Sequence, residues 1–256
     1  MTARVAWLAV APVKGMRLQE LPEAHLDAHG ARGDRRFVVT DSDWHLVNGK
    51  RIPTLVQVVA EASDGLLTLR FPDGAAVTGE PRPGAPATML AYGQGRPVRE
   101  VVGPWSAALS AWAGMALRLA QPQDEGDGVD RRRRAGVSLL SLASVRRLAV
   151  AAGTESVDPR RFRMTVGIDG VPAFEEERWL GGPVAVGGAS MRLQGNVGRC
   201  AVTTADPDTG TVDLPTLHLL RSLREGVDSS EPLPLGVWGE VVEPGVVRIG
   251  DEVGPC

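Results

Sequence analysis

The chain has 256 residues, of which 43% are hydrophobic and 23% charged, and its formal net charge is −3 at pH 7. This length accommodates one large β domain or two medium-sized domains with a real core. The small negative charge excludes the broad basic surface of a nucleic-acid-binding protein, so we expect no nucleic-acid partner.

Targeting and membrane segments are not predicted. No stretch reaches the roughly 18 consecutive apolar residues of a membrane span, and the apolar start over residues 3–12 is too short for a signal peptide. Two cysteines cannot form a disulfide framework, which indicates a reducing compartment. We therefore expect a cytoplasmic protein with no membrane partner.

The first half of the chain predicts a meander of short strands, because β-branched and aromatic residues alternate with turn residues. The predicted strands cover residues 4–10, 24–28, 36–40, 45–47, 55–60 and 66–71. Residues 72–97, rich in Gly, Pro and Ala, predict a loop with one or two strands. Apolar residues at helical spacing then predict a short helix over residues 105–113.

The second half begins with an expected mobile connection over residues 121–134, where the run Arg131–Arg134 indicates a solvated face. Helix signals follow at Ser141, with a stop at Gly153, and at the Asp158-Pro159 pair. Further expected elements are strands over residues 163–168, 184–186 and 190–193, a helix over 215–225, and a closing hairpin of residues 237–242 and 246–249.

Cys200 lies in the body of the chain, whereas the other cysteine, Cys256, is the last residue. A thiolate is both a nucleophile and a soft metal ligand, and the adjacent Arg199 would favour the thiolate over the thiol. Taken alone, such a cysteine is more commonly a small buried apolar residue. The residues around it shift that balance.

Two segments, residues 161–166 (RFRMTV) and 199–210 (RCAVTTADPDTG), resemble the MOSC family, which includes the C-terminal domain of molybdenum cofactor sulfurases and the mitochondrial amidoxime-reducing component. Residues 137–141, 173–179 and 250–251 agree with the family pattern. Residues 12–15, 33–37 and 50–55 resemble the β-barrel domain that often precedes MOSC. The resemblance implies a mainly β (α+β) fold: an N-terminal β-barrel-like domain in residues 1–120 and a MOSC β-barrel with peripheral helices in residues 121–256.

The resemblance also implies a molybdenum cofactor, Mo-molybdopterin, between the two parts, with Cys200 as the protein ligand to molybdenum. Such an anionic cofactor needs Lys or Arg donors from several segments. Lys14, Arg35 and Arg163 fall at the family's cofactor-contacting positions, and we expect them to converge on one cleft with Cys200. The further candidates are Gly15, Lys50, Arg51, Ser138, Arg161 and Thr165. Each arginine also has an ordinary structural alternative, such as an Arg161–Asp158 pair.

Some residues depart from the amidoxime-reducing pattern. Thr165 stands where those enzymes have Asn, Gly15 replaces a serine, and Arg133 and Arg134 occupy a region of small polar or acidic residues. These departures leave the substrate open. Two neighbouring segments have local explanations: Glu175–Glu177 predict a solvated acidic turn, and residues 206–210 predict a turn that holds the backbone after Cys200.

The function implied is an oxidoreductase that reduces N-hydroxylated or N-oxide small molecules. The sequence has no cysteine cluster for an iron–sulfur centre and no Gly-x-Gly-x-x-Gly fingerprint, so electrons would come from a separate reductase or ferredoxin. The alternative is a carrier of molybdenum cofactor, or of sulfur as a Cys200 persulfide, without turnover of its own. A barrel that binds another anion is a third possibility.

Overall fold

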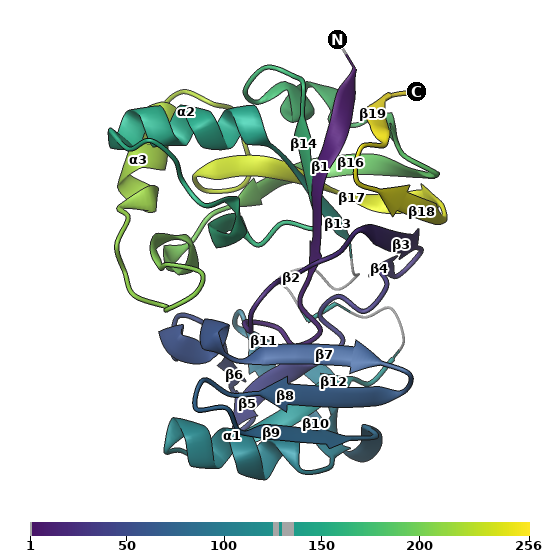
Figure 1. Ribbon diagram of the computed structural model, residues 1–256, viewed down its shortest axis with the longest axis vertical. Helices are drawn as coiled ribbons and strands as arrows, with labels where there is room; N and C mark the ends of the chain where they lie inside the picture. The colour runs from purple at the N-terminus through teal and green to yellow at the C-terminus, as the bar shows by residue number, and fades with distance from the viewer. Residues whose placement is uncertain (1, 125–127, 130–135) are drawn as a thin grey trace.

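The structure is a computed structural model that describes residues 2–124, 128–129 and 136–256. The expected arginine run Arg131–Arg134 and the middle of the predicted connection lie outside the described residues. Strands predominate among the described residues and three α-helices accompany them, so the mainly β fold predicted from the sequence is confirmed. Two bodies lie one above the other along the long axis (Figure 1). In the described part of the chain, no helix is long and apolar enough to cross a membrane.

The upper body is a closed barrel of seven strands. Its order is β1-β14-β13-β17-β16-β15-β19, and the pairing of β1 with β14 closes the ring. The strands are β1 (Ala3–Val10), β13 (Val137–Ser141), β14 (Val166–Asp169), β15 (Pro183–Val186), β16 (Ala189–Gly198), β17 (Pro234–Glu243) and β19 (Glu252–Pro255). Inward side chains such as Leu8, Leu139 and Leu193 are fully buried, so the barrel interior is a packed core.

The first strand of the chain completes the barrel formed by the last third of the chain. β1 pairs with β14 on one side and with β19 on the other, and the short strand β2 (Gln19–Glu20) extends it. In Figure 1, the purple β1 runs through the upper body beside green and yellow strands. The division predicted near residue 120 stays a prediction; the structure adds that residues 3–10 are part of the upper ring.

The lower body consists of two sheets around a second core. The five-stranded sheet has the order β10-β11-β12-β5-β6, and the three-stranded sheet is β7-β8-β9. Their bounds are β5 (Val38–Asp41), β6 (Leu46–Val47), β7 (Val59–Ser63), β8 (Leu66–Arg70), β9 (Ala76–Gly79), β10 (Arg82–Ala91), β11 (Gln94–Val102) and β12 (Leu117–Pro122). Trp105 of helix α1 (Trp105–Ala113) is fully buried between them and donates its indole N–H to Leu67 O at 3.1 Å.

Three local strand predictions were wrong. Residues 72–97 hold all of β9 and β10 and the start of β11 rather than a loop with one or two strands, and residues 53–57 form the 3-10 helix η1 before β7 begins at Val59. The expected closing hairpin does not form, since β18 (Gly245–Arg248) pairs with β3 (Glu23–Asp27), which pairs with β4 (Gly30–Ala31). That small sheet joins the N-terminal segment to the upper body.

Helices lie on the outside of the barrel, as predicted. Ser141 caps α2 (Leu142–Ala152) by accepting the Ala143 N–H, and Gly153 ends it with φ of 66°. This helix connects β13 to β14, the one parallel pair among the barrel pairings of the described residues. The remaining helices are α3 (Thr216–Leu223) and the 3-10 helices η2 (Pro159–Phe162), η3 (Glu175–Trp179) and η4 (Ala201–Thr204).

The seam that closes the barrel depends on a glycine. Gly167 of β14 faces Trp7 of β1, where the register of the pair shifts. A Cβ atom at position 167 would lie 1.8 Å from the Trp7 ring. The substitution Gly167→Ala should therefore displace Trp7 and destabilise the protein by about 1–3 kcal/mol, the usual cost of overpacking.

Urea unfolding measures this effect, with Gly254→Ala in the neighbouring strand β19 as the control. A Cβ at position 254 meets no heavy atom within 4 Å, so its change should stay within about 0.5 kcal/mol. Equal stability of the two variants would contradict the role of the Trp7–Gly167 contact in closing the ring.

Candidate functional site

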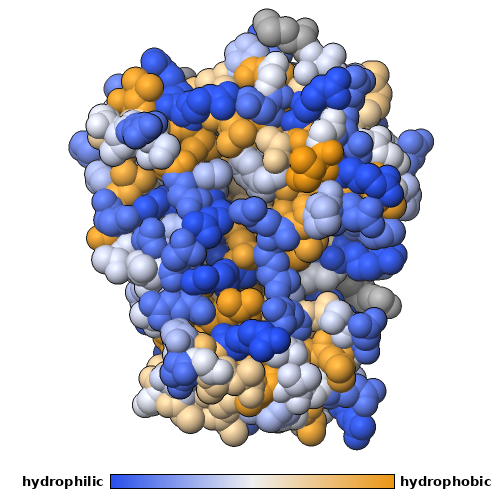
Figure 2. Space-filling model, viewed as in Figure 1, coloured by the Kyte–Doolittle hydropathy of each residue, from blue (hydrophilic) through white to orange (hydrophobic). Residues whose placement is uncertain are grey.

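A cleft of about 1430 Å³ lies between the two bodies, and residues of both bodies line it. On the face shown in Figure 2, hydrophilic side chains predominate at the waist between the bodies. Cys200 lines this cleft together with Lys14, Arg35 and Arg163. The cleft is larger than a typical pocket of about 300–1,000 Å³ for one small molecule, so it has room for a cofactor and a substrate.

Cys200 stands at the junction between β16 and η4. Its backbone is extended, with φ of −136° and ψ of 176°, and it is the N-cap residue of η4. The Cys200 carbonyl accepts hydrogen bonds from the Thr203 N–H and hydroxyl, each at 3.0 Å. Cys200 is a free, exposed cysteine. The interpretation of Cys200 as a small buried apolar residue is therefore wrong.

The neighbouring Arg199 is among the cleft-lining residues, but its guanidinium is bound inside the protein. Its guanidinium donates to the carbonyls of Leu235 and Phe162, and the residue is only 7% exposed. Burial lowers the pKa of Arg199 to about 9, while the negative charges of Cys200 and Glu176 oppose that shift. Arg199 thus remains a cation at neutral pH behind the exposed thiol.

The three basic residues expected to converge here all line the cleft, together with Arg32, Arg36, Lys50, Arg161 and Arg199. Lys14 is 9% exposed, and its Nζ lies 5.9 Å from the centroid of the Tyr92 ring. Arg35 donates to the Asp34 carboxylate and, through Nη2, to Arg163 O at 2.8 Å. Arg163 in turn donates from Nη2 to Met16 O at 2.6 Å. Arg35 and Arg163 therefore join the two chain halves as well as lining the space between them.

Both of these arginines have left-handed backbones, with φ of 50° at Arg35 and 53° at Arg163. This conformation is uncommon for residues other than glycine and persists only where the surrounding structure enforces it. Such strain is enriched at functional sites. The placement of these two guanidinium groups at the cleft therefore costs the protein some conformational free energy.

Gly15 and Ser138 line the cleft, whereas Thr165 lies behind it. Gly15 has φ of 90°, and a Cβ there would lie 2.9 Å from Leu55 Cδ2, which accounts for glycine in place of serine. Ser138 Oγ accepts the Thr165 N–H at 3.0 Å and contacts Thr165 Oγ1 at 3.2 Å. Thr165 is 1% exposed and is not among the cleft-lining residues.

Two other candidates have strong partners of their own. Arg161 lines the cleft, but its guanidinium binds the Asp213 carboxylate through two hydrogen bonds of 2.7 Å. Its expected pairing with Asp158 is wrong, since the neighbouring Arg160 takes that carboxylate. Arg51 binds Asp41 at 2.8 Å and is not among the cleft-lining residues.

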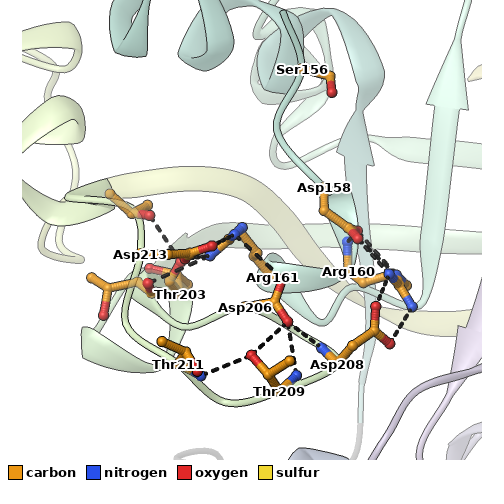
Figure 3. A network of polar contacts seen from close by, with 12 residues as sticks. Ser156, Asp158, Arg160, Arg161, Thr203, Asp206, Asp208, Thr209, Thr211 and Asp213 are labelled. Atoms are coloured by element: carbon orange, nitrogen blue, oxygen red, sulfur yellow. Dashed lines mark hydrogen bonds and ion pairs between the residues drawn. The ribbon is translucent and has the colours of Figure 1, made fainter. Parts of the chain in front are cut away.

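The turn that follows Cys200 is built as the sequence predicted. Asp206 Oδ1 accepts the Asp208 N–H at 3.0 Å, the Thr209 N–H at 2.8 Å and the Thr209 hydroxyl at 2.9 Å (Figure 3). The Thr209 N–H lowers the pKa of Asp206 below its usual value. Arg160 then bridges this turn to η2, because it binds both Asp158 and Asp208.

The same turn is fastened to the lower body. Arg17 donates to Asp208 O at 3.1 Å, and Gln57 donates from Nε2 to Thr209 O at 2.9 Å. Gly210, with φ of 77°, lies against the Pro53 carbonyl. The segment carrying Cys200 is thus held by contacts to both bodies, on either side of the cleft.

The prediction of a solvated acidic turn at residues 175–177 is wrong. Glu176 is 0% exposed; its Oε1 accepts the Ser141 N–H and the Ser144 hydroxyl, each at 3.1 Å, while Oε2 is buried without a hydrogen-bond partner. Glu177 is paired with the buried Arg224. Burial raises the pKa of Glu176 from 4.5 to about 6. Sequence patterns give no signal for this, since three consecutive acids are typical of a solvated segment.

Glu176 should make stability depend on pH. Because its pKa is higher in the folded chain, the native state binds the extra proton, and this stabilisation is lost as pH rises from about 4.5 to about 6. The loss amounts to about 2 kcal/mol, at 1.36 kcal/mol per unit. In Glu176→Gln, the free energy of unfolding relative to the original chain should rise by about that amount between pH 4 and pH 7. Urea unfolding at several pH values measures it; a pH-independent difference would contradict the assignment.

Comparisons with known proteins agree with this arrangement. Residues 2–93 match the family model described as the MOSC N-terminal beta barrel domain, and residues 126–254 match the MOSC domain. The chain is 27% identical to mitochondrial amidoxime reducing component 2 of Bos taurus, over 97% of this chain and 82% of that protein. It is 26% identical to mitochondrial amidoxime-reducing component 1 of Xenopus laevis, over 97% and 81%.

Among solved structures, the YUAD protein from Bacillus subtilis aligns with 99% of this chain and 94% of its own, at 14% identity and a TM-score of 0.47. The family models carry the assignment, because the MOSC model alone covers half of the residues. The chain belongs to the MOSC family, with an N-terminal MOSC β-barrel domain before the MOSC domain.

Proposed function

We propose that this protein is a molybdenum-cofactor-dependent oxidoreductase that reduces N-hydroxylated or N-oxide substrates. The observation that carries the proposal is the exposed Cys200 thiol on the wall of a cleft that Lys14, Arg35 and Arg163 also line. A single soft ligand beside several cations suits a metal held by an anionic cofactor. The similarity to amidoxime reducing components supports this substrate class.

The donor set fits the molybdenum cofactor. A cysteine thiolate is a soft ligand of the kind that binds such metals, and Cys200 is accessible from the cleft. Arginine offers a forked donor for phosphate and lysine a compact charge, and Arg35, Arg163 and Lys14 provide both. The absence of a side chain at Gly15 leaves the backbone accessible where Leu55 would exclude a Cβ.

Each residue then has a separate task. Cys200 holds the metal, and Lys14, Arg35 and Arg163 bind and neutralise the anionic part of the cofactor. Bound molybdenum would supply the two-electron chemistry that amino-acid side chains do not provide. The reduction breaks the substrate N–O bond, consumes two electrons and two protons, and releases water.

Several neighbours orient these groups. Ser138 presents a hydroxyl on the cleft wall and is fixed from behind by Thr165. Arg161 braces η4, because it binds Asp213 and also donates to Thr204 O at 3.5 Å. We therefore assign Arg161 and Thr165 a supporting role, and we leave Arg51 outside the site because it does not line the cleft.

Electrons have to come from another protein, a reductase or a ferredoxin, under this proposal. The described residues contain no group of three or more His, Cys, Asp or Glu side chains that could hold a further metal ion. The cofactor or sulfur carrier remains the alternative, since an exposed Cys200 thiol would also suit a persulfide.

The substitution Cys200→Ala should abolish turnover and leave the fold intact. An exposed side chain that loses one sulfur atom should change the free energy of unfolding by no more than about 0.5 kcal/mol. Reduction of a benzamidoxime by chemically reduced protein, purified from a host that makes the cofactor, should fall to background because the metal has lost its protein ligand. Cys256→Ala is the matched control and should keep full activity, since it is the exposed last residue.

Metal content separates the enzyme from the carrier. About one molybdenum per chain with turnover supports the enzyme, whereas bound cofactor without turnover supports the carrier. A Cys200→Ala protein that retains full molybdenum-dependent turnover would overturn the assignment of Cys200 as ligand. A protein from that host with neither molybdenum nor turnover would overturn the proposal as a whole.

A further inference from the structure

We propose that Arg199 is a positioning residue that fixes both Cys200 and Arg163 in place through one buried guanidinium group. Its catalytic consequence rests on the proposed function, whereas its structural consequence does not. Arg199 borders the cleft, but its guanidinium is engaged by main-chain carbonyls and by Met164 Sδ, so we assign it no contact with the anionic ligand or the substrate. It acts through the backbone on either side of the site.

The guanidinium reaches three separate acceptors. Nε and Nη2 donate to Leu235 O, the former at 2.9 Å; Nη1 donates to Phe162 O at 2.8 Å; and Nη2 lies 3.0 Å from Met164 Sδ. The group also lies 5.4 Å from the centroid of the Phe162 ring. Arg199 therefore ties the segment before Cys200 to η2 and to β17 at the same time.

The contacts on the η2 side flank Arg163. Phe162 precedes Arg163 and Met164 follows it, and Arg199 binds both. Arg163 has the left-handed φ of 53°, a conformation that persists only where neighbouring contacts enforce it. Arg199 provides such contacts on both sides of the strained residue. In this backbone conformation the Arg163 side chain reaches Met16 O and donates to it at 2.6 Å.

The burial of Arg199 supports a purpose beyond packing. The acceptors of its guanidinium are carbonyl oxygens and a sulfur atom rather than a carboxylate, although burial of a charge is costly. Arg224 makes a useful contrast: it is equally buried, at 8% exposed, but it is paired with Glu177 and lies 4.1 Å from the centroid of the Phe174 ring. A lysine lacks the rigid planar fork with which Arg199 serves acceptors on two segments at once.

A double-mutant cycle in cofactor-free protein tests the structural claim. Glycine tolerates a left-handed backbone and alanine does not, so Arg163→Gly should unfold at a higher urea concentration than Arg163→Ala. In the Arg199→Lys background this advantage of glycine should shrink by at least half, because residue 163 is released from the left-handed conformation. An undiminished advantage would overturn the proposal.

Met164→Leu provides a second background if Arg199→Lys does not fold. It removes only the sulfur acceptor and nearly conserves volume, so the advantage of glycine at position 163 should again decrease. An advantage equal to that in the original chain would count against the proposal in the same way. The Arg224→Lys background is the control: it should lower overall stability and leave the difference between the two residue-163 variants unchanged.

Steady-state kinetics of molybdenum-loaded protein test the catalytic claim. Misplacement of a reacting group by 1 Å can cost about 100-fold in rate, so Arg199→Lys should lower kcat by about that factor with a much smaller change in KM. Arg224→Lys should leave kcat unchanged. Equal kcat in Arg199→Lys and the original chain would refute the positioning role. If the original chain itself does not turn over, the proposed function fails, and the cycle still decides whether Arg199 holds Arg163.

Discussion

The site depends on an exchange of hydrogen bonds between arginine side chains and main-chain carbonyls of the opposite chain half. Arg35 donates to Arg163 O at 2.8 Å, and Arg163 donates to Met16 O at 2.6 Å. A hydrogen bond from a charged donor is stronger than a neutral one, and each of these also sets the separation of the two walls. The cleft is therefore held open and held together by the same residues that we propose bind the anionic cofactor. Loss of either arginine would change the shape of the cleft as well as its charge.

The path of the chain explains how residues so distant in sequence reach one cleft. β1 is a strand of the upper barrel and ends at Val10, so Lys14 follows within a few residues and is delivered to the lower edge of that barrel. The peptide at Lys14 is then fixed by donation of its N–H to Phe37 O at 2.8 Å. The chain therefore passes from the upper body to the lower body at the place where the cofactor would lie, and hydrogen bonds fix it there. We expect this wall of the cleft to be rigid for that reason.

Local signals in the sequence predicted where helices and strands lie better than they predicted which strands pair. Helix α1 has the predicted bounds, and the caps at Ser141 and Asp158 are present, because capping depends on neighbouring residues alone. Strand pairing is different: residues 245–248 pair with residues 23–27, and no local pattern reports a contact between segments so far apart. The burial of Glu176 was not predicted for the same reason, because it depends on contacts with β13 and α2 rather than on the neighbouring acidic residues. The cleft-lining positions of Lys14, Arg35, Arg163 and Cys200 came from family resemblance, because a basic residue alone carries no such information.

Two of the departures from the amidoxime-reducing pattern, at positions 15 and 165, have physical explanations in the structure, whereas Arg133 and Arg134 lie outside the described residues. At position 15 the φ of 90° favours glycine, and a serine Cβ would also lie 2.9 Å from Leu55 Cδ2. At position 165 the threonine is buried and supports Ser138, which is the residue that lines the cleft. Neither change alters the Cys200 thiol or the cations of Lys14, Arg35 and Arg163 at the cleft wall. The cleft is also lined by Glu23, His25 and Asp27 of β3, by His29 of the turn that follows and by Arg32, so acidic, imidazole and basic groups all contribute to its remaining wall.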